Sequence, residues 1–522
     1  PGGTITRTVF DQRDRAVCTY VGTNDSGATD GDPSAGREPC SAAAGSSSSS
    51  SSASSASESA LNNMVLVHEQ QYDDTGCTGC GGGGGQLVST TQHVDASTTR
   101  VTEFQYDWRG RREYVLPPAD QQGRTVYTRF YFDNLDQVIK VERYHEQSPS
   151  ADILLSREES SFDEAGRVYA TRRYAVDPAA GTVGNYLAGY TWYDAAGQVI
   201  KQQAPGQRAF SKTQYDGLGR ATKQLVGYDL SEIPGATLSS SSSSSSSSGA
   251  AASYPAVTNV DGDTLLEQTE TTRDEAGNVT LVTVRQRRHD ATGTGELSTM
   301  TGAQPQARVS YVAYWYDEVG RSIATAHYGT HGDAVLVRPS SVPARTDSIL
   351  VTTIEYDSEG QAYKTIDPAG REDRQEFDAA GRLTKTIQNY QDGTVDGNAP
   401  DEDVTVERTY TADGQIATLT AQNPSTGNQT TRYVFGTTLA NSALARADLL
   451  RAEIYPDSDD GANPLGHGAD GVYDRVEYQY NRQGERTQRK DQNGTVHAYE
   501  FDALGRVVHD RVTTLGTNVD GA

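Results

Sequence analysis

The chain has 522 residues, of which 35% are hydrophobic, and it is rich in Gly (52) and Tyr (29) but has only two Met. The length allows either several ordinary domains or one continuous repeat structure, and this strand- and turn-forming composition favours the repeat. A formal net charge of −25 repels phosphate groups, so nucleic acid and anionic membranes are disfavoured as partners. No segment approaches the roughly 18 consecutive apolar residues of a membrane-spanning helix.

The first hundred residues hold all four cysteines, Cys18, Cys40, Cys77 and Cys80. An even count in a chain that reads as an export product favours two disulfides, for instance Cys18 to Cys40 and Cys77 to Cys80. Cys77 and Cys80 also have the spacing of half a zinc site, so free thiols and a four-thiolate metal site stay open as alternatives. Runs of Ser and Gly in this part predict low-complexity loops.

An aromatic-Asp-x-x-Gly-Arg/Gln motif recurs from residue 101 onward, often at intervals of 21 or 22 residues, as from Tyr356 to Phe377 and from Tyr193 to Tyr215. Alternating polar and apolar residues flank the copies, which predicts a strand on each side. Asp accepts hydrogen bonds from amides of a tight turn, and Gly supplies the positive φ that closes a hairpin. The clearest copies are Tyr106-Asp107 with Gly110-Arg111, Tyr215-Asp216 with Gly219-Arg220, Tyr316-Asp317 with Gly320-Arg321, Phe377-Asp378 with Gly381-Arg382, and Phe501-Asp502 with Gly505-Arg506.

The other two residue types of the motif predict contacts between hairpins. An aromatic ring at the end of a strand can stack on the corresponding ring of the next hairpin. The Arg that follows the Gly can pair, through its planar fork, with the turn Asp of a neighbouring unit. Both roles are structural.

One segment departs from the strand pattern. Residues 438–451 contain good helix formers, with Leu439, Leu444 and Leu450 and several alanines on roughly one face. This predicts a short surface helix packed against the sheet.

The motifs quoted above resemble the RHS/YD-repeat family, which includes bacterial RHS proteins, the cocoon-forming components of toxin complexes, and the teneurins. The resemblance covers residues 101–522 as a repeat region, whereas residues 1–100, with Tyr72-Asp73 as the one candidate copy, form a divergent N-terminal β region. It implies an all-β fold, in which antiparallel hairpins form a ribbon that winds into a spiral wall, shell or β-solenoid. Asp367-Pro-Ala-Gly370 resembles part of the family's self-cleaving cap, but it lies among the repeats, so self-cleavage is not expected.

No nucleophile elbow, zinc-protease helix or phosphate loop occurs in the sequence, so we expect no catalytic residues and no enzyme activity. Acidic loops at 30–32, 261–263, 392–403 and 457–460 have calcium-favouring oxygens but lack the twelve-residue calcium-loop pattern. Calcium therefore stays an alternative to turn chemistry, and no other cofactor or metal is expected.

The expected function is that of a structural scaffold in a large secreted or cell-surface bacterial protein, forming an extracellular assembly or interaction surface. One alternative is a hollow shell that encapsulates a toxin, and another is a carbohydrate-binding adhesion module, for which exposed Trp192 and Trp315 would be the sign. Expected partners are copies of the chain or flanking domains, with a toxin payload or surface glycans under the alternatives. Location outside the cell follows from the resemblance.

Overall fold

The computed structural model of the chain describes residues 3–11, 13–24, 63–73, 85–120, 123–146, 152–229, 257–462, 464–516 and 519. Their secondary structure is almost entirely β, with 30 strands in one antiparallel sheet and a two-stranded hairpin beside it. The predicted all-β, antiparallel hairpin fold is therefore confirmed. None of the helices in these ranges is long and apolar enough to cross a membrane.

The chain divides into two compact units, and it passes through the first unit both before and after the second. Unit 1 comprises 1–130, 143–153 and 405–522, and unit 2 comprises 131–142 and 154–404. The boundary between the two units lies inside the repeat region. The predicted division into 1–100 and 101–522 rests on where the repeat motif occurs in the sequence, and it stays a prediction.

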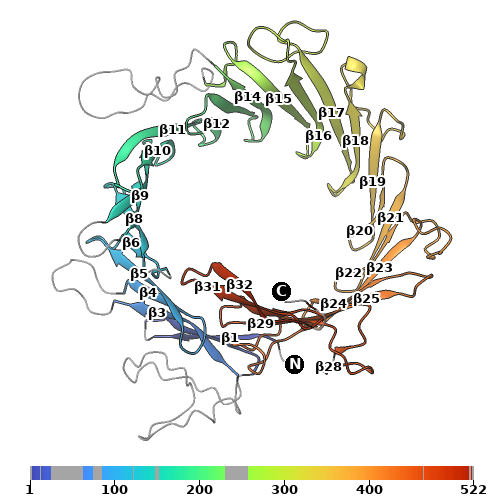
Figure 1. Cartoon of the computed structure of the whole chain (residues 1–522). Helices are drawn as coiled ribbons and strands as arrows, with labels where there is room; N and C mark the ends of the chain where they lie inside the picture. Colours follow the sequence, from blue (N-terminus) through green and yellow to red (C-terminus); the bar gives the residue numbers. More distant parts are fainter. Residues whose placement is uncertain are drawn as a thin grey trace, which may run out of the picture. The chain divides into compact units, whose positions relative to one another are not determined.

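Unit 1 holds strands from both ends of the chain (Figure 1). These are β1 (Ile5–Phe10), β2 (Ala16–Gly22), β3 (Val65–Tyr72), β4 (Leu87–His93), β5 (Thr99–Tyr106), β6 (Arg112–Leu116), β7 (Val126–Phe132), β23 (Val404–Tyr410), β24 (Ile416–Ala421), β25 (Gln429–Phe435), β26 (Leu450–Ile454), β27 (Gly461–Ala462), β28 (Leu465–Gly466), β29 (Val476–Tyr480), β30 (Arg486–Lys490), β31 (Val496–Phe501) and β32 (Val507–Thr514).

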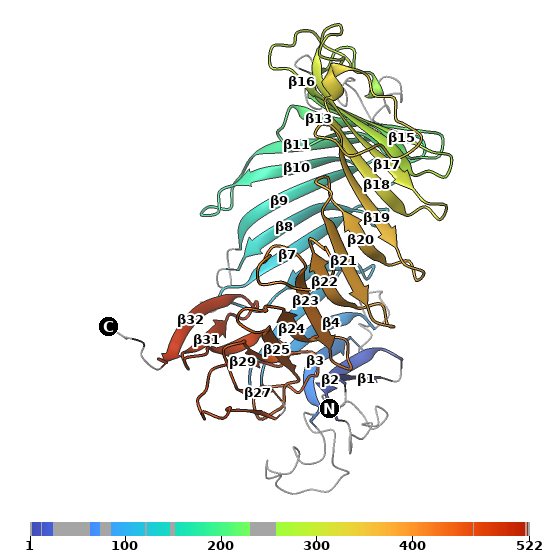
Figure 2. The ribbon, with the colours of Figure 1, turned by 90° about the vertical axis from the view of Figure 1, so that its right-hand side faces the viewer.

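Unit 2 is a run of consecutive hairpins whose strands lie side by side (Figure 2). Its elements are β8 (Val138–His145), β9 (Ile153–Phe162), β10 (Val168–Val176), β11 (Val183–Tyr193), β12 (Val199–Gln203), β13 (Ala209–Tyr215), β14 (Ala221–Tyr228), β15 (Thr264–Arg273), β16 (Val279–Arg287), β17 (Ala307–Tyr316), β18 (Ser322–Gly329), the 3-10 helix η4 (His331–Asp333), β19 (Leu350–Tyr356), β20 (Ala362–Ile366), β21 (Glu372–Phe377) and β22 (Leu383–Gln388).

The strand register repeats from hairpin to hairpin. We call each Asp-x-x-Gly-Arg turn a corner, number its residues 1 to 5, and count the preceding aromatic as position 0. In nine strand pairs, position 8 of one hairpin lies opposite position −3 of the next, whether the connection is 367–371 or the much longer 229–263. The pairs are Cys18 with Glu69, Tyr114 with Arg129, Ala170 with Tyr190, Lys201 with Lys212, Lys223 with Glu270, Leu281 with Ala313, Ala324 with Thr353, Lys364 with Arg374, and Gln488 with Ala498.

Each unit has its own buried clusters on one face of the sheet. In unit 2 the strict alternation of β17 buries Val309, Tyr311, Ala313 and Trp315 against β18 and β19. Unit 1 has smaller clusters, such as Cys18, Tyr20 and Leu66 on β2 and β3. Period-2 alternation places every second side chain on the same face, which is why short strands suffice to build these cores.

The helix predicted for 438–451 is wrong. These residues form turns that end where β26 begins at Leu450. Their amides bind partners outside a helical pattern: Ala443 N–H donates to the Tyr480 carbonyl at 2.8 Å, and Arg446 N–H donates to Thr437 Oγ1 at 3.0 Å. Leu444 is fully buried between strands rather than on one helical stripe. Tertiary contacts thus override the helix propensity of the alanines.

Candidate functional site

The corners share one set of hydrogen bonds, shown here by Asp107. Its N–H donates to the Arg111 carbonyl at 2.9 Å, and Gly110 N–H donates to the Asp107 carbonyl at 2.9 Å. Asp107 Oδ1 accepts the amides of Arg109 (2.9 Å) and Arg111 (3.0 Å), while Oδ2 accepts Arg111 Nε at 2.7 Å. Gly110 has φ of 78°, which an L side chain adopts only under strain. The corner therefore satisfies its carboxylate from within five residues.

The other predicted corners have the same geometry. Position 5 Nε lies 2.7–2.8 Å from position 1 Oδ2 at each of them. These are Tyr215, Asp216, Gly219 and Arg220; Tyr316, Asp317, Gly320 and Arg321; Phe377, Asp378, Gly381 and Arg382; and Phe501, Asp502, Gly505 and Arg506, with the glycines at φ of 77–83°.

These hydrogen bonds set the acidity of the corner aspartates. Burial opposes ionisation of Asp107, but the Arg111 side chain and the two amides outweigh it and hold its pKa below the usual value. At Asp216 and Asp378 the amide of position 5 is the largest cause, and the arginine side chain adds to it in lowering the pKa. The carboxylates are thus held in the charged form that the turn requires.

The arginine pairs with the Asp of its own corner, so the predicted pairing with a neighbouring turn Asp is wrong. The reason is geometric: positions 1 and 5 face each other across the turn, within reach of the planar fork. Contact with the next corner is made to the backbone instead, since Arg167 Nη1 donates to the Asp194 carbonyl at 3.1 Å. Gln198 Nε2 donates similarly to the Gly219 carbonyl at 2.8 Å.

Where position 0 is a tyrosine, its hydroxyl joins its hairpin to the preceding one. It donates to the carbonyl of position 6 of the preceding corner, as in Tyr193 to Val168, Tyr215 to Val199, Tyr316 to Val279 and Tyr356 to Ser322, all at 2.9 Å. Where the preceding corner carries an arginine, as at Tyr193 and Tyr356, the ring lies against that arginine. Arg167 is 4.6 Å from the Tyr193 ring centre and Arg321 is 4.5 Å from that of Tyr356. The predicted ring-on-ring ladder is replaced here by tyrosine–arginine contacts.

The corner at 481–485 differs, because Asn481 replaces Asp and Glu485 replaces Arg. Asn481 Oδ1 still accepts the amides of Gln483 and Glu485 at 3.0 Å, and its Nδ2 donates to Glu485 Oε2 at 2.6 Å. Glu485 then binds the buried Arg100 of β5 through both oxygens, each at 2.8 Å. This corner, which has no arginine of its own, is therefore bound by one from a strand far away in the sequence.

Further contacts of this corner reach β3 and β4. Gln483 Nε2 donates to the carbonyls of Val67 (2.8 Å) and His93 (2.7 Å), and Arg482 N–H donates to the Val94 carbonyl at 2.8 Å. Beside it, Leu444 packs on Val21 and Val65. We call this set of contacts, from 444 and 481–485 to β2–β5, the seam of unit 1.

A pocket of about 650 Å³ opens beside the seam, lined by residues that include Asp95, Arg100, Tyr499 and Asp502. Its aspartates are engaged within their own turns. Asp95 Oδ1 accepts the amides of Ser97 and Thr98, and these bonds overcome the effect of burial and lower its pKa to about 2. The aspartates of this lining already accept hydrogen bonds within their own turns, so they are not placed as a general base beside a nucleophile.

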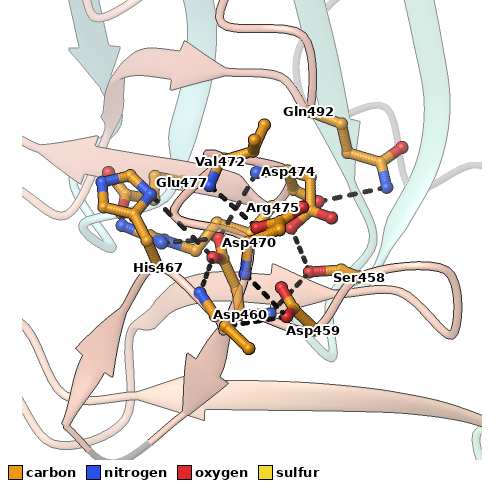
Figure 3. A network of polar contacts seen from close by, with 12 residues as sticks. Ser458, Asp459, Asp460, His467, Asp470, Val472, Asp474, Arg475, Glu477 and Gln492 are labelled. Atoms are coloured by element: carbon orange, nitrogen blue, oxygen red, sulfur yellow. Dashed lines mark hydrogen bonds and ion pairs between the residues drawn. The ribbon is translucent and has the colours of Figure 1, made fainter.

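An acidic cluster brings Asp474 against the predicted acidic loop at 457–460 (Figure 3). Carboxylate oxygens of Asp459, Asp460 and Asp474 lie within 4.8 Å of one another. Asp460 is fully buried, and its Oδ2 pairs with Arg475 Nη1 at 2.6 Å. Arg475 also contacts Glu477 at 2.6 Å, so a protein cation already neutralises the centre of the cluster. Calcium takes six or more oxygens, and its binding to this loop stays a prediction.

Two other predicted acidic loops are explained by turn and ion-pair chemistry. Asp403 Oδ1 accepts the amides of Gln391 and Gly393 at 2.9 Å each. Asp263 pairs with the buried Lys212 at 2.5 Å. The acidic loop at 30–32 lies outside the described residues.

Cys18 is disulfide-bonded and buried on β2. Its partner is not among the described residues, and Cys40, Cys77 and Cys80 all lie outside them. The connectivity therefore stays a prediction.

Sequence reasoning missed Arg100, Gln483 and Glu485 as contact residues. The available signal was the departure of the 481–485 corner from the motif, since Asn and Glu cannot form the internal Asp–Arg pair. Nothing in the spacing pointed to Arg100, which lies 385 positions away.

No family model matches the chain, and no curated protein matches it. Among solved structures, it is similar to a crystal structure of TcdB2-TccC3 (13% identity, TM-score 0.26, covering 97% of this chain and 28% of that one) and to one of TcdB2-TccC3-TEV (11%, 0.25, 97% and 30%). It is also similar to a structure of the Photorhabdus luminescens Tc holotoxin pore (13%, 0.26, 97% and 30%). The chain spans about three-tenths of the length of these chains. Such low identities and TM-scores carry no argument about its activity.

Proposed function

We propose that this chain is a non-enzymatic structural wall, and that its winding encloses a space. The observation that supports winding is the seam, where the 481–485 corner binds strands that precede it by 385 to 416 positions. An open ribbon of hairpins needs contacts only between neighbours in sequence. Contacts between hairpins near the two ends of the chain, both in unit 1, are what a wall that returns to its starting point requires.

The chemistry of the corners supports the non-enzymatic part of the proposal. In corners such as those of Asp107, Asp216 and Asp378, the carboxylate is bound by amides and by its own arginine, which lowers its pKa and leaves it a poor proton acceptor. Residues engaged in this way stabilise the fold. Repeating the same corner many times lengthens the wall and does not assemble a single active centre.

Secretion or display at the surface of a bacterial cell is part of the proposal. The disulfide at Cys18 supports it, because structural disulfides persist in oxidising compartments. Within such a wall, an enclosed toxin is the payload that the family resemblance suggests, and an extracellular assembly without a payload is the second form.

The carbohydrate-binding alternative finds less support. Trp315 is 4% exposed in the core of unit 2, and Trp192 is half-buried beneath Lys201. Sugar binding by stacking needs open aromatic faces. Trp108 is exposed, but it stands alone at the tip of a corner.

Electron microscopy of the purified 522-residue chain tests the winding. We expect a rounded outline with a low-density centre. Under the same conditions, a variant with Glu485→Ala and Gln483→Ala should open, while Glu500→Ala, at an exposed pair with Arg511, should not. Straight or open filaments formed by the unaltered chain would refute the enclosed form.

A further inference from the structure

The corner at 274–278, between β15 and β16, differs from the arginine-containing corners in the side chain at position 5. At Arg321, for example, Nε lies 2.7 Å from Oδ2 of its own corner aspartate, and the guanidinium lies 4.5 Å from the ring centre of Tyr356, the next position 0 aromatic. Position 5 of the 274–278 corner is Asn278, whose N–H and Nδ2 bind its own Asp274 at 2.8 and 3.1 Å. The cation that would bind the aspartate and cover the next ring is therefore missing from this corner.

A pocket of about 580 Å³ in unit 2 is lined by the residues that an arginine at this place would touch. These are Asp274, Asn278 and Tyr316, the next position 0 aromatic, and they are joined by Trp315 and Arg338. Among the described residues, Asp274 forms no ion pair and no cation lies over the Tyr316 ring. The remaining charged side chains of the lining are acidic and favour a cation as well: Asp317, which pairs with Arg321, and the exposed Glu318. The volume lies within the range of small-molecule sites, roughly 300–1,000 Å³.

Corners with glutamine at position 5 show what a longer side chain does there. Gln198 Nε2 reaches the Gly219 carbonyl of the next corner at 2.8 Å, and the side-chain oxygen of Gln361 is buried. Neither glutamine lines the 580 Å³ pocket. Asn278 is one methylene shorter, and its Nδ2 turns back to its own Asp274 instead of reaching forward. The short residue at position 5 and the pocket beside it together distinguish this corner from the others that lack arginine.

Two charged groups of the pocket lack partners of opposite charge. Burial opposes ionisation of Asp274, but the Asn278 side chain and the amides of the corner outweigh it and hold its pKa below the usual value, so this carboxylate is charged. Arg338 donates from Nε and Nη2 to the Tyr314 carbonyl at 3.1 and 2.7 Å, and it lies 4.7 Å from the Trp315 ring centre. In the described part of the chain it pairs with no carboxylate. The pocket thus offers one anion and one cation to a ligand.

We propose that this pocket binds a guanidinium group, either that of free arginine or that of an arginine side chain on another protein. The group takes the place of the missing position 5 arginine, donating to Asp274 Oδ2 and lying over the Tyr316 ring. Arginine-containing corners show that this pair of contacts suits a planar guanidinium, whose fork an ammonium lacks. Arg338 adds a partner for the carboxylate of free arginine. The inference goes beyond the proposed wall and does not depend on whether the wall closes.

Calorimetric titration and saturation-transfer NMR of the 522-residue chain measure the binding. The probes are L-arginine, L-citrulline, and a short alanine peptide with one central arginine and both ends blocked. We expect L-citrulline to bind about tenfold or more weakly than L-arginine, because its urea group has the same shape but no charge. Tighter binding of L-arginine than of the peptide identifies a small-molecule ligand, and equal or tighter binding of the peptide identifies a protein side chain. Both results support the proposal.

Two substitutions test the site itself. Asn278→Arg supplies the missing guanidinium from the chain and should weaken binding of the probes about tenfold or more. Asp274→Asn removes the charge and should have a similar effect; Asn already occupies position 1 at Asn481, where its Oδ1 accepts the same amides, so the corner still forms. Gln361→Arg is the matched control, because it also introduces arginine at a position 5 but lies outside the pocket. It should leave binding unchanged.

Hydrogen exchange of β15 to β18 checks that each variant keeps its fold. Asn278→Arg restores the residue type that the arginine-containing corners carry, so a loss of binding with unchanged protection is a loss of the site. The inference is overturned if L-arginine binds no better than L-citrulline, or if Asn278→Arg has no larger effect than Gln361→Arg. Neither result changes the outline of the chain in the microscope, so this failure is distinguishable from failure of the wall proposal.

Discussion

The corner at 107–111 and the corner at 481–485 have the same backbone geometry but different roles. The first pairs Asp107 with its own Arg111, so it needs nothing from outside. The second holds Asn481 and Glu485, and both carboxylate oxygens of Glu485 bind Arg100 from a distant strand. The comparison teaches that a carboxylate at position 5 can bind a cation from elsewhere in the chain, whereas an arginine at position 5 is bound within its own corner.

Acid should affect the first kind of corner most, and many at once. A depressed native pKa adds stability that is fully present above the ordinary aspartate value near 3.8 and is lost as pH falls through the lower native values. We therefore expect the urea midpoint to stay flat from pH 7 to about pH 5 and to drop steeply below about pH 4. A urea midpoint that already declines above pH 5 would show that groups other than the corner aspartates determine the acid sensitivity.

Glu485→Ala should produce the largest effect of a single substitution, because it leaves the buried Arg100 without its partner. The expected loss is about 3 kcal/mol of local stability. Hydrogen exchange of the β3–β5 and 481–485 amides measures it, since a chain of two units need not unfold in one step. Glu500→Ala removes an exposed pair and should change these rates by less than the equivalent of about 0.5 kcal/mol.

Asp107→Ala tests the internally satisfied corner. It removes the acceptor of two amides and of Arg111 Nε, with an expected cost of about 2 kcal/mol. Asp107→Asn keeps an oxygen for the amides and should cost about half as much. Faster exchange at the amides of Arg109 and Arg111 is the readout, and equal effects of the two variants would argue against the separate contribution of the ion pair.

Tyr193→Phe should have the smallest effect, about 1 kcal/mol, because it removes one neutral hydrogen bond to the Val168 carbonyl and keeps the ring over Arg167. Exchange at β10 and β11 should increase while β17 and β18 stay protected. Tyr193→Leu, which also removes the ring, should lower the stability further. If the two variants had the same effect, the tyrosine–arginine contact would contribute nothing to stability.

The sequence was sufficient to predict the hairpins, since Asp and Gly at fixed positions specify the turn and alternation specifies the strands. It was not sufficient for contacts between hairpins, because the reach of the Tyr193 hydroxyl and the choice of Arg111 for its own Asp107 depend on three-dimensional spacing. The helix at 438–451 failed for a similar reason: Leu444 and its neighbours are fixed by strands far away in sequence. Among the residues of the seam, only the irregularity of the 481–485 corner was visible beforehand.

The constant register has a consequence for how such a chain can change. Because position 8 meets position −3 across both a five-residue connection and the long stretch at 229–263, extra residues between hairpins leave the pairing frame intact. Evolution can therefore lengthen these connections one at a time, and a foreign domain inserted between Asp229 and Val257, before the buried Val260 and Asp263, should leave the β14–β15 alignment undisturbed.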